Sequence, residues 1–280
     1  RFNGRLRINQ GGNNTALRPD NQNSNATVAY DVKMDDRVSV QSLIDILRLR
    51  NLKSETIEEV RNYGRLISSV GPATTSYDMY KTHTQSKFCA PGNEATISLM
   101  CNQDILFSIP LNAGLFMSGS NLNLADLGGL AISIMLNNDA QVLYGAEATD
   151  GASDNIKDVS LTGDYFVFSA PQPPKAAVIN YPAYNSFMTI LNSGDDQQSL
   201  NLAQRSVRSL TLNTIPSSHL NNYTFNGYAT PKLRNTNAAG TSYTTDAEVL
   251  EYTFMKGAVK FPKQYSTTER EAVKNISYET

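Results

Sequence analysis

The stretch from Ile105 to Tyr144 constrains the fold of this chain more than any other. Its only charged residues are Asp126 and Asp139, and its remaining polar residues are mostly Asn and Ser. Two apolar runs, Ile105–Ile109 and Leu130–Leu136, have the length of buried strands and are separated by a loop. Glycine and serine punctuate these strands rather than surrounding a pocket together with charged residues. The stretch therefore favours a structural β protein that packs and assembles.

Length and charge limit the classes of protein that are compatible with this sequence. The 280 residues allow one large β domain or two small ones. The net charge of −2 provides no basic field for a nucleic-acid backbone, and Arg1, Arg5 and Arg7 are interpreted as part of a solvated arm. No run reaches the roughly 18–20 apolar residues that cross a bilayer, so no transmembrane segment is expected.

Further short strands and a few helices are predicted along the chain. Between Val38 and Leu49 the apolar alternation changes phase, which predicts a strand with a β-bulge. A helix is predicted over Ile57–Val70, with Thr56 and Glu59 as a capping box and Gly71-Pro72 as its stop. A second helix is predicted to begin near Thr268. The additional strands are predicted at Thr27–Val32, Ala95–Cys101, Gln141–Tyr144, Tyr165–Ser169, Val207–Ile215, Tyr223–Tyr228, Val249–Phe254 and Ala258–Phe261.

Many short strands, few helices and long polar loops predict an all-β fold. The expected architecture is an antiparallel β-sandwich of the jelly-roll type with one or two short helices. Residues 1–27 are expected to form an extended arm, residues 28–250 the sandwich, and residues 251–280 the start of a second roll or a C-terminal extension. The long loops expected to cap the sandwich or fill seams between subunits are Asp139–Val159, Asn192–Leu200 and Asn235–Thr245.

No catalytic motif is present, so the chain is expected not to be an enzyme, and no catalytic, cofactor-binding or metal-binding residue is predicted. His83 and His219 are far apart, have no metal-ligand spacing and are interpreted as loop residues. Cys89 and Cys101 could pair across strands, but buried free thiols are preferred.

Two groups of polar residues leave alternatives open. The pairs Asp35-Asp36 and Asp195-Asp196 are interpreted as solvated loop tips, with weak Ca²⁺ binding as the alternative. Five tyrosines either form a sugar-binding face or, as preferred, border the core or a subunit contact with the ring buried and the hydroxyl in water. These are Tyr63, Tyr77, Tyr80, Tyr181 and Tyr184.

Four segments resemble the jelly-roll capsid proteins of eukaryotic double-stranded DNA viruses, the lineage of virophages, polinton-like viruses and giant viruses. The first, Asp35–Val70, contains a step similar to the family's N-Y-x-R, formed by Asn62, Tyr63 and Arg65. The others are Phe107–Asn138 (FSIPLNAG followed by LGGLAISIMLNN), Ser206–Tyr228 (SVRSLTLNTIPSSHLNNYTFNGY) and Phe254–Tyr265 (FMKGAVKFPKQY).

The resemblance implies a structural capsid protein that self-assembles into the icosahedral shell of a DNA virus. It is greatest to the first roll of a double-jelly-roll major capsid protein. A single-roll minor capsid or penton protein is the alternative, because a double roll needs more chain than follows Tyr265. The implied partners are other copies of the chain, in a trimer or pentamer, and neighbouring capsid proteins, with residues Asn9–Asn25 lying across a neighbour.

The implied location is the virion, after assembly inside the host cell, with no cofactor and no strong nucleic-acid binding. The competing hypothesis is a carbohydrate- or receptor-binding β-sandwich module.

Overall fold

The computed structural model describes residues 1–9, 32, 34–35, 38–74, 104–118, 122–144, 151–165, 167, 180–190, 199, 215, 217–228, 252–256 and 259–266. The chain divides into two units. One comprises residues 1–213 and 217–229, and the other comprises residues 214–216 and 230–280.

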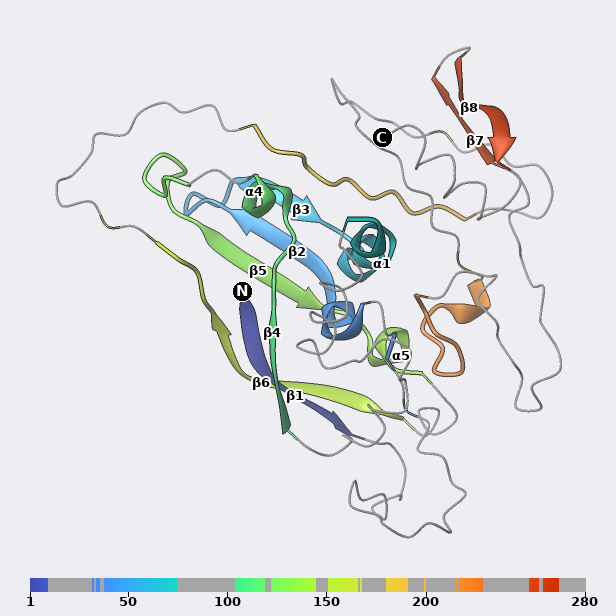
Figure 1. The fold of residues 1–280 in the computed structure, drawn as a ribbon. Coiled ribbons are helices and arrows are strands. Elements are labelled where there is room, and N and C mark those ends of the chain that lie inside the picture. Colours follow the sequence, from blue (N-terminus) through green and yellow to red (C-terminus); the bar gives the residue numbers. More distant parts are fainter. Residues whose placement is uncertain are drawn as a thin grey trace, which may run out of the picture. The chain divides into compact units, whose positions relative to one another are not determined.

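The first sheet of the larger unit is built around β1 (Phe2–Asn9), which pairs antiparallel with β4 (Asp104–Ile109) and β6 (Ser153–Leu161) (Figure 1). Alternate residues of β1 are buried, as expected for a strand with one face on a core. The prediction of an extended arm is therefore wrong for the first nine residues. Arg5 and Arg7 lie on the outer face of this amphipathic strand. Their charge obscures the period-two pattern of Phe2, Leu6 and Ile8 in the sequence.

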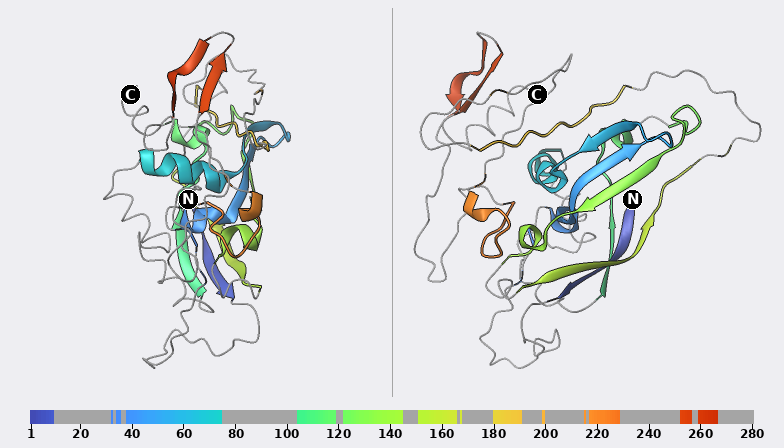
Figure 2. Two further views of the ribbon diagram at one scale, coloured as in Figure 1. Left: turned by 90° about the vertical axis from the view of Figure 1, so that its right-hand side faces the viewer. Right: turned by 180° about the vertical axis from the view of Figure 1, so that it is seen from behind.

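The second sheet has the order β3-β2-β5 and is also antiparallel (Figure 2). Its strands are β2 (Ile44–Arg50), β3 (Thr56–Val60) and β5 (Ala131–Leu136). The strands predicted at Ile105–Ile109 and Leu130–Leu136 are confirmed as β4 and β5. The prediction that they are buried is wrong for β5, which has no buried residue, and holds in β4 only for Phe107 and Ile109. Residues of both sheets contribute to a single hydrophobic core, including Leu6 and Ile109 from the first sheet and Leu47 and Val60 from the second.

The helix predicted over Ile57–Val70 is wrong in its first half. Residues Thr56–Val60 form β3, and α1 spans Tyr63–Thr74, so Gly71-Pro72 lies within the helix rather than stopping it. Asn62, with a φ of 51°, makes the change of direction between strand and helix, a conformation that Asn tolerates. No capping box forms, because Thr56 and Glu59 both belong to the strand.

Further predictions also differ from the structure. The segment Val38–Leu49 begins with the 3₁₀ helix η1 (Ser39–Leu43), although the predicted irregularity is confirmed by a register shift between Ile44 and Ile46. The short helix α5 (Asp139–Val142) overlaps the strand predicted at Gln141–Tyr144, and α4 (Gly114–Met117) lies in the loop predicted between the two apolar runs. The loop expected over Asp139–Val159 ends in β6 (Ser153–Leu161), which covers its last third. Residues Tyr223–Tyr228 form turns after η3 (Ser217–His219), not a strand.

The smaller unit contains an antiparallel hairpin of β7 (Tyr252–Lys256) and β8 (Val259–Ser266), which overlaps two predicted strands. The described chain is thus β-rich, with two three-stranded antiparallel sheets, this hairpin and a few short helices. Among the described residues, no helix has the length and hydropathy needed to cross a membrane. Several predictions lie outside the described residues: those on Cys89, Cys101, His83, Tyr77, Tyr80, Asp36, Asp195-Asp196, Ala95–Cys101, the helix near Thr268 and most of Thr27–Val32 and Val207–Ile215.

Candidate functional site

Four segments that are distant in sequence meet in the core around Tyr228, which is 1% exposed. Its hydroxyl donates to the Ser42 carbonyl oxygen at 2.9 Å and accepts from Asn137 Nδ2 at 2.9 Å. The Arg65 guanidinium carbon lies 5.7 Å from the centre of the ring, within cation–π range. A Cβ at Gly64 would lie 2.8 Å from the ring, so a side chain at this position would clash with Tyr228. We call this group of residues the Tyr228 joint.

The N-Y-x-R step connects α1 to two other parts of the larger unit. Tyr63 Oη accepts from the Asn112 backbone N–H at 2.8 Å, and Arg65 Nη1 donates to the Gly227 carbonyl oxygen at 3.0 Å. Burial raises the pKa of both Tyr63 and Tyr228 well above the usual range and lowers the pKa of Arg65. The prediction that the Tyr63 hydroxyl stays in water is therefore wrong, because its ring and hydroxyl are both buried.

Asp35 performs a similar joining role beside the Tyr228 joint. Its Oδ1 accepts from the Val38 backbone N–H at 3.2 Å and its Oδ2 accepts from Asn226 Nδ2 at 2.8 Å. The carboxylate is 1% exposed, so the prediction of a solvated loop tip is wrong for Asp35. Asn226 and Tyr228 thus fix both ends of a three-residue segment to the core.

A polar cavity of about 170 Å³ lies next to the joint. Its lining includes Asp45, Asn62, Arg65, Asn137 and Gln141. Gln141 is buried, its Oε1 accepts from the Asn221 backbone N–H at 3.3 Å, and its Nε2 has no hydrogen-bond partner within the described part of the chain. The cavity could hold several waters, at about 30 Å³ each, or a small polar group. The described lining contains amides, one guanidinium and one carboxylate but no Ser, Cys or His that could serve as a nucleophile.

Two carboxyl groups meet where α5 contacts β6. The Asp154 backbone N–H donates to Asp139 Oδ1 at 3.2 Å. Burial, followed by a hydrogen bond and charge repulsion from Asp139, raises the pKa of Asp154 to about 8. Asp154 therefore keeps its proton to a higher pH than an exposed aspartate does. Within the described residues, no group of three or more His, Cys, Asp or Glu side chains could hold a metal ion.

Buried Glu58 connects β3 to the start of α4. Its two carboxylate oxygens accept from the backbone N–H groups of Gly114 and Leu115 at 2.8 and 2.9 Å, which caps α4. A Cβ at Gly114 would lie 1.6 Å from the Pro182 carbonyl oxygen, so the chain around residue 182 crosses directly over the start of α4. Tyr181 donates to the Ile57 carbonyl oxygen at 2.9 Å, and burial, with a smaller effect of Glu58, raises the pKa of Tyr181.

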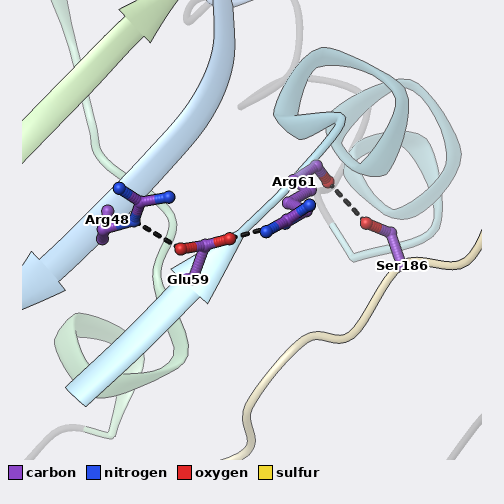
Figure 3. A network of polar contacts seen from close by, with 4 residues as sticks. All are labelled: Arg48, Glu59, Arg61 and Ser186. Atoms are coloured by element: carbon purple, nitrogen blue, oxygen red, sulfur yellow. Dashed lines mark hydrogen bonds and ion pairs between the residues drawn. The ribbon is translucent and has the colours of Figure 1, made fainter. Parts of the chain in front are cut away.

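A network of charges lies on the outer face of β3 (Figure 3). Glu59 pairs with both Arg48 and Arg61, at 2.5 Å for the Arg61 Nε contact, and the Arg61 carbonyl oxygen accepts from Ser186 Oγ at 2.9 Å. Hydrogen bonds from Arg48 and then Arg61 lower the pKa of Glu59. Pairs of this kind contribute little stability, about 0–1 kcal/mol, and the three side chains leave one net positive charge beside residue 186.

His219 and the arginines at the start of the chain also contact neighbouring side chains. His219 is buried and stacks on Phe225, with ring centroids 4.2 Å apart. Arg5 pairs with Asp158 at 3.1 Å, Arg7 pairs with Asp104 at 3.6 Å, and Arg1 donates to Ser108. Arg5 and Arg7 are therefore balanced by acidic neighbours on the same sheet, whereas Arg1 donates to a neutral serine.

These contacts define the class of the molecule: a β-rich protein whose buried polar side chains join backbone segments that are far apart in sequence. Comparisons with protein-family models, curated proteins and solved structures find no match for the chain.

Proposed function

We propose that this chain is a structural capsid protein that self-assembles into the icosahedral shell of a DNA virus. In this proposal its two sheets belong to a jelly-roll sandwich, and its partners are other copies of the chain, in a trimer or pentamer, and neighbouring capsid proteins. Assembly takes place inside the host cell, and the protein resides in the virion. The resemblance of the four segments to capsid proteins supports this proposal.

One observation carries the proposal: the described chain uses polar side chains to fix its backbone from within, while large apolar side chains remain exposed. Single exposed apolar residues are ordinary, whereas groups of them mark association surfaces. Obligate contacts between subunits bury roughly 2,000 Å² or more and are comparatively apolar. The exposed apolar residues include Leu106, Met135, Leu136, Val159, Leu161, Phe187, Met188 and Ile190.

Rigidity of the subunit gives further support, because a shell needs subunits of constant shape. The N-Y-x-R step, which the resemblance singled out, holds α1 to Asn112 and Gly227 through buried hydrogen bonds. Such contacts are costly to break, since each leaves a buried polar group without a partner.

The experiment is the mass of the species in solution, measured by light scattering on the purified chain over a wide range of concentrations. A trimer, a pentamer or a larger shell is the expected result. A monomer at every concentration contradicts self-assembly and removes the proposal.

A second candidate, a carbohydrate- or receptor-binding module, is favoured by the polar cavity beside the Tyr228 joint. Its amides and Arg65 present hydrogen-bond donors of the kind that bind hydroxylated ligands. This candidate predicts a monomer that binds oligosaccharides in a saturable manner and loses this binding on Arg65→Lys substitution. Absence of binding across a panel of glycans would remove it.

A further inference from the structure

Residues Asn180–Ile190 form an extended segment, which we call the strap, beside the edge strand β3. Two side-chain hydroxyls hold it to backbone carbonyl oxygens of this region: Tyr181 to Ile57 at 2.9 Å and Ser186 to Arg61 at 2.9 Å. The second contact is visible in Figure 3. In the described sheet β3 pairs with β2 on one side only, and the strap contacts this region through side chains rather than through a backbone ladder.

The inner side of the strap is fixed. Tyr181 and Tyr184 pack against the hydrophobic core, and Pro182 crosses over Gly114. These anchors fall in the first half of the strap, and Ser186 adds a fourth just before its apolar end. The strap therefore has a defined backbone position as far as Ser186.

The end of the strap is apolar and exposed, and Met188 also lines the rim of the cavity beside the Tyr228 joint. Phe187, Met188 and Ile190 are 51%, 67% and 81% exposed. Large apolar side chains bury on the order of 150–250 Å² each, so these three present roughly 300–400 Å² of apolar surface. This is the size of the largest apolar patch on an ordinary monomer, and such patches commonly mark a contact.

We propose that the strap packs against the strap of a second copy of this chain. The proposal rests on the self-assembly proposed above and identifies the contact that would carry part of it. Two straps together bury roughly 600–800 Å² of apolar surface, which suits the centre of a standard interface of about 1,600 Å² in total. A self-complementary patch of this kind gives a closed two-fold contact.

The surroundings of the strap suit a second copy. Arg48, Glu59 and Arg61 balance one another to a single net positive charge, which produces little repulsion between two copies. The exposed Asn180 and Asn185 supply a polar rim next to the apolar centre.

The test compares two triple variants by light scattering. Phe187→Ser, Met188→Ser and Ile190→Ser remove the apolar face of the strap, and all three positions are exposed, so folding is preserved. The control replaces Leu52, Met117 and Leu124, which are also exposed and lie outside the strap, by serine. The concentration at half-association rises at least about tenfold for the strap variant and less than that for the control, because apolar residues at the centre of a contact dominate its affinity.

A second variant tests the geometry directly. Met188→Cys brings two thiols together across a strap-to-strap contact, so mild oxidation yields covalent dimers. The wild-type chain, which already contains Cys89 and Cys101, is the control and yields fewer.

The outcomes separate the two proposals. If the wild-type chain never associates, self-assembly itself is refuted. If the wild-type chain associates and the strap variant does so equally well, or if Met188→Cys yields no additional dimers, the strap contact is refuted while self-assembly stands.

Discussion

Replacement of Glu58 tests whether a buried carboxylate holds the two faces of the core together. Glu58 and Glu59 are neighbours on β3, but their side chains lie on opposite faces of the strand. Glu58 is 4% exposed and caps α4 through Gly114 and Leu115, whereas Glu59 lies in the surface network with Arg48. The same substitution at the two positions therefore separates a buried capping role from a surface charge.

The magnitude follows from the bonds that are lost. Glu58→Ala leaves two buried N–H groups without an acceptor, at about 1–3 kcal/mol each, and also opens a small void. We expect the free energy of unfolding to fall by about 3–5 kcal/mol. Glu58→Gln keeps one acceptor oxygen and turns an amide N–H₂ toward the other donor, so a loss of about 2–3 kcal/mol is expected. Glu59→Ala removes only surface ion pairs, at about 0–1 kcal/mol.

Urea denaturation of the variants, followed by circular dichroism, measures these differences as long as the slope with denaturant is unchanged. The order Glu58→Ala, then Glu58→Gln, then Glu59→Ala is the expected ranking of the losses. Equal losses for Glu58→Ala and Glu59→Ala would show that the carboxylate does not cap α4, and the reasoning would be refuted.

Three further substitutions test other contacts. Tyr228→Phe removes two buried hydrogen bonds and lowers the free energy of unfolding by about 1–3 kcal/mol in urea denaturation, whereas Tyr165→Phe, at an 82% exposed position, leaves it unchanged. Gly114→Ala displaces the strap and raises its hydrogen-exchange and proteolysis rates, while Gly163→Ala, with open space around it, does not; equal rates in the two variants contradict the crossing. The pKa of Asp154 is raised from 3.8 to about 8, so its folded state binds the proton more tightly and stability falls as pH rises between these values, by at most about 1.4 kcal/mol per pH unit. Asp154→Asn flattens this slope in denaturation curves taken across that range, and an unchanged slope contradicts the assignment.

Strands with continuous apolar runs were predictable, and amphipathic ones were not. β4 and β5 were found because their runs are apolar and bounded by turn residues, which needs no knowledge of partners. The sequence predicts a helix where β3 lies because Thr56 and Glu59 have the spacing of a capping box, a pattern that is equally compatible with a strand. The decisive fact, that Glu58 points inward to cap α4, depends on a contact with residues more than fifty positions away.

The Tyr228 joint illustrates why buried polar groups escape sequence reasoning. Tyr228 meets Ser42, and Asn226 meets Asp35, across nearly two hundred positions, and neither spacing forms a motif. The paired residues Asp139 and Asp154 come together only because α5 packs beside β6. The N-Y-x-R step was the one local signal, and the structure gives its Tyr63 and Arg65 physical roles that the resemblance alone did not provide.

A strap-to-strap contact should be weak when no other contact joins the two copies. The strength of this contact determines how the mass of the assembled species depends on concentration. Burial of roughly 600–800 Å² of apolar surface at about 25 cal/mol per Å² yields a gross gain of about 15–20 kcal/mol. Association costs on the order of 4–15 kcal/mol, and ordering of the side chains takes more, so only a few kcal/mol remain. A pair of copies should therefore separate readily on dilution. A closed shell in which each copy adds other contacts to its strap contact would persist, because the contacts then act together. Self-assembly through the strap thus predicts a steep dependence of mass on concentration rather than a dimer that is stable at every concentration.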